Sequence, residues 1–189
     1  LPGGPPGWRR EGVSFYYFVA SLPTLTLGAP AAASLADFRA EAVRLLPAEA
    51  VAELEAVLQA DRGSARSTFA ARWFAAETQL RNAVARTRAA RRGVEALPFL
   101  HEHAGFSVQI EQAVTEAYGR GNPLERELAL DRLRWAQLEE LSRESPFGVE
   151  AVLAYGLKLQ LVERWAGLTD EAGQAALQAA VKQVREASV

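Results

Sequence analysis

A pair of histidines is the first feature of this sequence with the makings of chemistry: His101 and His103 flank Glu102. Imidazole and carboxylate groups bind zinc and related metals, but a protein site of that kind needs three or four ligands in a fixed geometry. The chain has no cysteine to complete such a set. We therefore interpret the segment as a solvated loop, and we expect neither a metal nor another cofactor.

Residue sets for catalysis are also missing. The sequence contains no GxxxxGK(S/T) phosphate loop, no GxGxxG turn and no GxSxG nucleophile motif. Adjacent carboxylates such as Glu139 and Glu140 fall on the polar side of an expected helix, where solvation is a simpler role than general acid–base catalysis. Since no nucleophile–base set is visible, we expect no catalytic residues. An enzyme is therefore the least favoured of three classes of function.

Arginine is unusually dense between residues 65 and 92, where seven arginines accompany a single acidic residue, Glu77. Arginines in the last turns of a helix complement the negative end of its dipole, which is the simpler interpretation. The functional interpretation is a docking face for an acidic partner or for phosphate. Because the net charge is −2 and exposed aromatics are not interleaved, we expect no nucleic acid. The candidate partner-binding residues are Arg81, Arg86, Arg88, Arg91 and Arg92.

Charged and polar residues also interrupt the apolar stripes of the expected helices. Asp131, for example, falls between Leu128 and Trp135. Burying an unpaired charge costs about 3–5 kcal/mol, so such side chains must find partners or stay at the edge of the core. We expect structural ion pairing rather than catalysis, in a polar seam between the long arginine-rich helix and the helix after Asn122. The expected members of the seam are Glu77, Arg81, Asn82, Asp131 and Lys158.

The chain as a whole is typical of one globular domain. Its 189 residues are 49% apolar and 23% charged, which suits a buried core and argues against wholesale disorder. No apolar run approaches the ~20 residues needed to cross a bilayer. We therefore expect a cytoplasmic protein, peripheral on a membrane complex at most and without direct insertion.

The first twelve residues differ from the rest. Leu1–Gly12 is rich in proline and glycine and has no apolar periodicity, which predicts a disordered tail ahead of one helical domain over residues 13–189. The chain contains no methionine, and the pattern changes abruptly at Val13. One interpretation is that Val13 is the true first residue, read from an unusual start codon. The other is a natural flexible tail whose initiator has been removed.

Apolar residues recur at helical spacing through most of the chain, which predicts an all-α fold. The segment from Val13 to Ser21 fits a strand or a short helix, and a loop follows it. Further helices are expected to begin at Ser34, Pro47, Ala65, Phe106, Asn122, Pro146 and Thr169. The helix over residues 147–166 is apolar on two sides and is the expected central one. Short connections between them predict a single bundle of about six or seven helices.

Three stretches of the sequence resemble a known family. They are SFYYFVASLP (Ser14–Pro23), WFAAETQLRNAVARTRAAR (Trp73–Arg91), and the two C-terminal helices over residues 122–141 and 146–165. They resemble an uncharacterised domain family found beside V/A-type ATPase subunits in bacteria. That family is in turn similar to the C subunit of these ATPases, called the d subunit in the vacuolar enzyme. The positions that resemble its helical repeat are Glu77, Arg81, Asn82, Arg86, Phe147, Ala154, Tyr155 and Lys158.

The resemblance implies a fold like that of the C subunit and a non-enzymatic coupling part. The C subunit lies between the membrane rotor ring and the central stalk and transmits rotation without binding nucleotide. This chain is much shorter than the C subunit. We therefore expect an accessory or rotor-coupling part of the ATPase that contributes to ion transport, with the rotor ring or the stalk as partner. The alternative is an unrelated helical adaptor whose arginine face binds an acidic protein or RNA.

Overall fold

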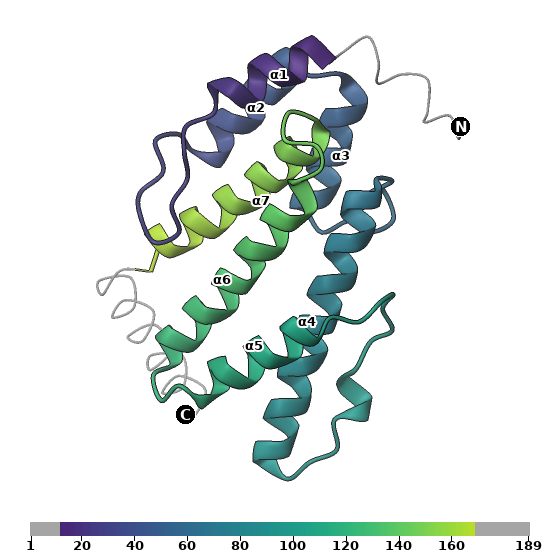
Figure 1. Cartoon of the computed structure of the whole chain (residues 1–189), viewed down its shortest axis with the longest axis vertical. Coiled ribbons are helices and arrows are strands. Elements are labelled where there is room, and N and C mark those ends of the chain that lie inside the picture. Colours follow the sequence, from purple (N-terminus) through teal and green to yellow (C-terminus); the bar gives the residue numbers. More distant parts are fainter. Residues whose placement is uncertain (1–11, 169–189) are drawn as a thin grey trace, which may run out of the picture.

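The computed structural model describes residues 12–168, which form seven α-helices and one short 3₁₀-helix without strands (Figure 1). The predicted all-α helical bundle is therefore confirmed. The predicted tail, apart from Gly12, and the helix expected from Thr169 lie outside the described residues. Among the described helices, none is both long enough and apolar enough to cross a membrane. The helices are α1 (Gly12–Ser21), α2 (Leu35–Leu45), α3 (Ala48–Leu58), α4 (Thr68–Arg92), α5 (Val108–Gly119), α6 (Pro123–Ser142) and α7 (Val149–Ala166), with the 3₁₀ turn at Leu97–Phe99.

Two clusters of buried apolar side chains hold these helices together. The α7 cluster joins α1, α2, α3 and α7 to the first half of α4 and the end of α6, and it includes Phe18, Leu54, Trp73, Leu138 and Leu153. The α5 cluster joins the second half of α4 to α5 and the start of α6, and it includes Leu80, Ile110, Val114 and Leu130. Helices α4 and α6 thus contribute to both clusters and extend from the region of α3 toward α5 (Figure 1).

Helix α7 is the central helix, as its two apolar sides predict. It packs against α1, α2, α3 and α6. Gly156 allows the closest approach, because a Cβ atom there would lie 3.0 Å from Leu54 Cδ1 and 3.1 Å from Phe38 Cε1. The residues buried along this helix include Val152, Leu153, Leu159 and Val162.

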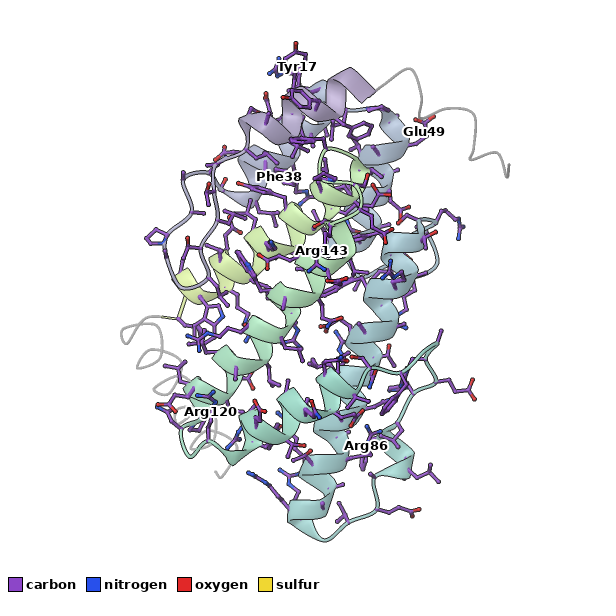
Figure 2. The ribbon with its side chains drawn as sticks, in the orientation of Figure 1. Tyr17, Phe38, Glu49, Arg86, Arg120 and Arg143 are labelled. Carbon is purple, nitrogen blue, oxygen red and sulfur yellow. The ribbon has the colours of Figure 1, made fainter. Side chains whose placement is uncertain are left out.

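The aromatic segment at the start of the described chain is helix α1 rather than a strand. Phe15 and Phe18, three residues apart, are buried on one face. Tyr16 and Tyr17 are exposed, and the Tyr16 ring lies 4.8 Å from the ring of Phe147, centre to centre. Tyr17 marks one end of the body, and Arg86 of α4 lies toward the other (Figure 2). Helical spacing therefore decides which aromatic side chains enter the core.

Three helix ends carry the caps that their local sequence predicts. Ser34 and Asp37 form a capping box at the start of α2, each side chain accepting the other residue's backbone N–H. Asn122 caps α6 by accepting the N–H of Leu124. Gly93 closes α4 in the left-handed region, at a φ of 67°. These ends follow from residues only a few positions apart.

Helix α4 begins at Thr68, three residues later than predicted, because α3 holds the chain before it. Glu53, buried on α3, accepts the N–H groups of Arg66 at 2.8 Å and of Ser67 at 2.9 Å. Ser67 in turn caps the helix by accepting the N–H of Ala70 at 3.0 Å. A carboxylate from another helix therefore fixes where α4 starts.

Two other predicted helix starts are wrong. Helix α7 begins at Val149 rather than Pro146, because the residues before it form consecutive turns closed by the N–H of Gly148. Helix α5 begins at Val108, so Phe106 lies in the preceding segment with an exposed ring instead of in the core.

The buried side of α6 also differs from the prediction. The expected apolar stripe is Leu124, Leu128, Trp135 and Leu138, of which Leu138 alone is fully buried, and Leu124 is exposed. Leu130 and Asp131 are buried as well. The reason is that α6 packs against α4, α5 and α7, so burial is not confined to one stripe.

Replacing Gly156 by alanine tests the close contact at the centre of the α7 cluster. The added methyl group must displace Leu54 or Phe38, and overpacking of this kind costs about 1–3 kcal/mol. We expect Gly156→Ala to lower the free energy of unfolding by that amount in urea denaturation followed by circular dichroism. Gly119→Ala is the control, because it adds the same methyl group to a helix where nothing lies within 4 Å. Equal stability of the two variants would contradict the close packing.

Candidate docking site

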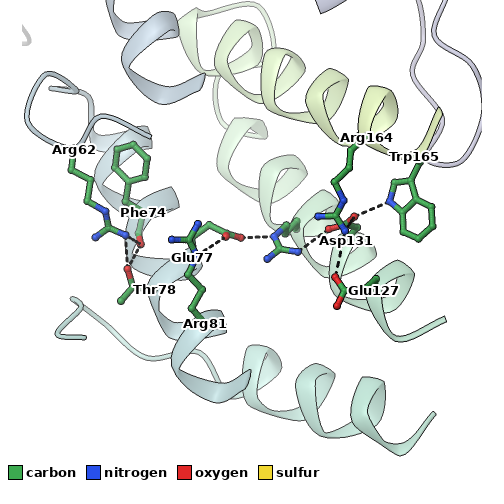
Figure 3. Close-up of polar contacts among 10 residues, drawn as sticks. Arg62, Phe74, Glu77, Thr78, Arg81, Glu127, Asp131, Arg164 and Trp165 are labelled. Atoms are coloured by element: carbon green, nitrogen blue, oxygen red, sulfur yellow. Dashed lines mark hydrogen bonds and ion pairs between the residues drawn. The ribbon is translucent and has the colours of Figure 1, made fainter. Parts of the chain in front are cut away.

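Asp131 on α6 is completely buried, and three donors surround its carboxylate. Arg134, one turn further along α6, donates from Nη1 to Asp131 Oδ1 at 2.7 Å. From α7, Trp165 Nε1 donates to Asp131 Oδ2 at 2.7 Å, and Arg164 Nη2 lies 3.1 Å from the same oxygen. Both oxygens are therefore satisfied, and the carboxylate joins α6 to the end of α7 (Figure 3).

The network continues from α6 to α4 through Arg134. Its Nε atom donates to Glu77 Oε1 at 2.8 Å, and the other oxygen of Glu77 lies 3.8 Å from Arg81 Nε. Burial lowers the pKa of the Arg134 guanidinium, but the charges and hydrogen bonds of Glu77 and Asp131 outweigh burial and raise that pKa above its usual value. Arg134 therefore stays charged and links α6 to α4, while Asp131 joins α7 to the same network.

The structure brings part of the predicted polar seam together. Glu77 and Asp131 meet through Arg134, and Arg81 lies at the outer edge with 67% of its side chain exposed. Arg134 was not among the predicted members of the seam. The signal for it is its position three residues after Asp131, the spacing at which an acid and a base meet on one helix face.

The other two residues of the predicted seam, Asn82 and Lys158, make separate contacts. Lys158 Nζ lies 3.1 Å from Glu139 Oε1 and 4.7 Å from the centre of the Trp135 ring. The buried amide of Asn82 pairs with the backbone of His101, donating to its carbonyl at 2.7 Å and accepting its N–H at 3.0 Å. Asn82 therefore faces the segment between α4 and α5 and not the Asp131 network.

Gln79, one turn before Asn82, holds the same segment at a second point. Its side-chain amide donates to the Ser107 carbonyl and accepts the Ser107 N–H, both at 2.8 Å. The two amides act on the backbone as a neighbouring strand would, although the segment has no regular structure there. We call these two pairings the amide clasps. They fix a loop against α4 with polar contacts that were not predicted from the sequence.

The histidine pair lies on this clasped segment. His101 is held through its backbone, at the first clasp. Across the described part of the chain, no group of three or more histidine, cysteine, aspartate or glutamate residues is placed to hold a metal ion.

Three of the five predicted partner-binding arginines hold α5 in place. Arg86 forms an ion pair with Glu111 at 2.7 Å. Arg88 Nε donates to the Tyr118 hydroxyl at 2.8 Å. Arg91 donates to the Tyr118 carbonyl, and its guanidinium lies 5.1 Å from the centre of the Tyr118 ring. Much of the arginine density of α4 therefore serves packing between α4 and α5.

The remaining two, Arg81 and Arg92, border a cleft of about 400 Å³ that we call the arginine groove, and Arg88 lines the same cleft. It lies between α4, the segment that follows α4, and α6. Its charged lining residues are Arg81, Arg88, Arg92, Arg134 and Glu127. Its larger apolar lining residues are Leu80, Val84, Val94, Phe99 and Leu130. Because Glu77 and Asp131 already compensate Arg134, the positive charge of the lining comes from Arg81, Arg88 and Arg92, and such a cleft is suited to an acidic, partly apolar partner.

Comparison with known sequences shows that part of the chain is similar to an uncharacterised family. Residues 107–188 match the family described as protein of unknown function (DUF2764). The chain matches no curated protein and no solved structure. The prediction of an uncharacterised family is therefore confirmed for this part of the chain, which includes α5, α6 and α7. The match carries no statement about an ATPase.

Replacing Asp131 by alanine tests the buried network. The change leaves Arg134 without one of its two acids and removes the acceptor of Trp165, which we expect to cost about 2–4 kcal/mol. Urea denaturation of the two proteins measures this loss. Glu140→Ala, which removes an exposed ion pair with Arg143 on the same helix, is the matched control and is expected to cost less than about 0.5 kcal/mol. Unfolding of Asp131→Ala at the wild-type urea concentration would show that the network adds no stability.

Glu111 gives the contact between α4 and α5 a dependence on pH. Burial raises the pKa of its carboxyl, but hydrogen bonds from Arg86 and Gln79 and the charge of Arg86 outweigh burial and lower that pKa below its ordinary value. A carboxyl with a lowered folded-state pKa adds stability above its unfolded pKa and loses it as the pH falls through the folded value.

We therefore expect the stability difference between wild type and Glu111→Gln to be constant above about pH 5.5 and to shrink below about pH 4.5. Thermal unfolding between pH 3 and pH 7 measures it, and Glu116→Gln, an exposed carboxyl on the same helix, is the control. A difference that grows on acidification would contradict the assignment.

Proposed function

We propose that this chain is a non-enzymatic accessory or rotor-coupling subunit of a V/A-type ATPase that docks at the cytoplasmic side of the membrane rotor. The arginine groove is the observation that carries the proposal, because it offers an exposed basic and apolar surface on a packed helical body. Exposed arginines orient a partner more than they bind it, and apolar area supplies affinity. The sequence resemblance to the family found beside V/A-type ATPases names the complex.

The contacts between the described helices are also suited to a subunit that transmits mechanical force. The Glu77–Arg134–Asp131 seam ties α4 to α6, and Trp165 and Arg164 tie the end of α7 to the same point. Helices α4 and α6 pass through both apolar clusters. A load applied at the groove would therefore reach the α7 cluster through packed side chains.

A helical adaptor for an acidic protein is the second candidate function. The same groove favours it, because its charge and apolar lining specify an acidic partner without specifying an ATPase. RNA fits less well, since Phe99 is the single aromatic side chain lining the groove in the described part of the chain. Single strands are usually bound by several stacked aromatic residues.

Co-purification from native membranes tests the ATPase proposal. We expect the tagged protein to retain ATPase subunits at low ionic strength and to lose them as salt is added, because exposed ion pairs are screened. Reversing Arg81 and Arg92 to glutamate should release the subunits. Reversing Arg86, Arg88 and Arg91 is a poorer test, since these residues hold α5.

Arg72→Glu is the matched control, because Arg72 is exposed on the same helix and does not line the groove. It should retain the subunits as wild type does. If no ATPase subunit co-purifies with the wild-type protein at low salt, the ATPase proposal fails and the adaptor becomes the leading candidate.

A further inference from the structure

The arginine groove has a linear arrangement of charge. Arg81, Arg88 and Arg92 are spaced seven and four residues apart on α4, so they lie on one helix face. At 1.5 Å per residue they extend over about 16 Å, or three helical turns. Leu80 and Val84, four residues apart, line the groove beside them. The basic row therefore follows the axis of α4 over three turns, with an apolar pair beside its first turn.

The opposite wall of the groove is held in position before any partner arrives. Val94 and Phe99 belong to the segment after α4, and both line the groove while remaining exposed. The Asn82 clasp at His101 fixes the chain two residues beyond Phe99. Ordering this wall on binding therefore costs little conformational entropy, which favours affinity.

The charges of the basic row are largely uncompensated within the described residues. The nearest acid to Arg81 is Glu77 at 3.8 Å, and Glu77 is already bound to Arg134 at 2.8 Å. Arg92 has no ion pair in the described part of the chain. Glu127, the one acidic lining residue among residues 12–168, lies 3.4 Å from Arg164 of α7. The groove therefore presents a net positive row to solvent.

We propose that the arginine groove binds an α-helix of a partner protein that carries an apolar row beside a row of carboxylates. This inference adds the chemistry of the docking partner to the proposed function. It rests on the proposed function in one respect, namely that the partner helix belongs to the ATPase. A helix fits because the basic row follows the axis of α4 over about three turns and the exposed apolar side chains of Val94 and Phe99 line the same groove, as in helix-in-groove recognition. A compact anion would instead need arginines that converge on one point.

The probe is a synthetic, cross-linked helix of about 20 residues with leucines on one face and glutamates beside them at spacings of seven and four. A second peptide carries lysine at each glutamate position and is otherwise identical. Binding of each labelled peptide to the full-length protein is followed by fluorescence anisotropy at low salt. We expect the glutamate peptide to bind at least about tenfold more tightly than the lysine peptide.

Two variants locate the binding. Reversing Arg81 and Arg92 to glutamate should invert the preference, so that the lysine peptide binds more tightly. Phe99→Ala should weaken binding of the glutamate peptide about fivefold. Phe106→Ala is the control, because Phe106 is also exposed (69%, against 60% for Phe99) on the same segment but lies outside the groove. Circular dichroism should show unchanged helicity in all three variants, since the replaced side chains are exposed.

Equal binding of the two peptides would overturn the inference. So would an unchanged preference for the glutamate peptide after Arg81 and Arg92 are reversed to glutamate. So would tighter occupancy of the groove by a second copy of the chain, measured by sedimentation, or by a peptide of residues 169–189. The result is separable from the ATPase proposal. If the glutamate peptide is preferred but no ATPase subunit co-purifies, the groove inference holds and the ATPase proposal fails. If ATPase subunits co-purify even after Arg81 and Arg92 are reversed, and neither peptide is preferred, the ATPase proposal holds and the groove inference fails.

Discussion

Taking a carboxylate out of water is costly unless its charge is matched and both of its oxygens accept hydrogen bonds. Asp131 meets that condition with donors from α6 and α7, and its partner Arg134 also forms an ion pair with Glu77 of α4. A shift of α4, α6 or α7 along its axis by one residue would separate these groups. The buried carboxylate therefore restricts how the three helices align, a restriction that apolar packing alone, being non-directional, imposes less strictly.

The arginines of α4 divide into two groups by what they contact. Arg86, Arg88 and Arg91 find partners on α5 and fasten that helix from outside the α5 cluster. Arg81 and Arg92 lie on the side of the groove, where nearby acids are already engaged or absent within the described residues. One helix thus serves both as a support for α5 and as a charged surface, and Arg88, which donates to Tyr118 and also lines the groove, belongs to both.

Features that depend on near neighbours were predicted well from the sequence. The capping box at Ser34 and the closing glycine Gly93 need only residues within one turn. Two of the failures involve distant partners: Glu53 fixes the start of α4 from another helix, and Gln79 holds Ser107 across the loop. The start of α7 was missed for a local reason, because the chain before Val149 forms turns. The arginines of α4 are likewise visible in the sequence, but their spacing does not show which of them bind Tyr118 and Glu111 of α5.

The match to the uncharacterised family begins at residue 107, where the second amide clasp lies. Helix α4 is outside the matched stretch, yet its Leu80 and Ala83 complete the α5 cluster, and its Glu77 neutralises Arg134. The matched stretch therefore does not include all the helices that form the α5 cluster. A relative that shared only this stretch would expose the apolar faces of α5 and α6 unless a helix from its own preceding sequence, or from another chain, took the position of α4.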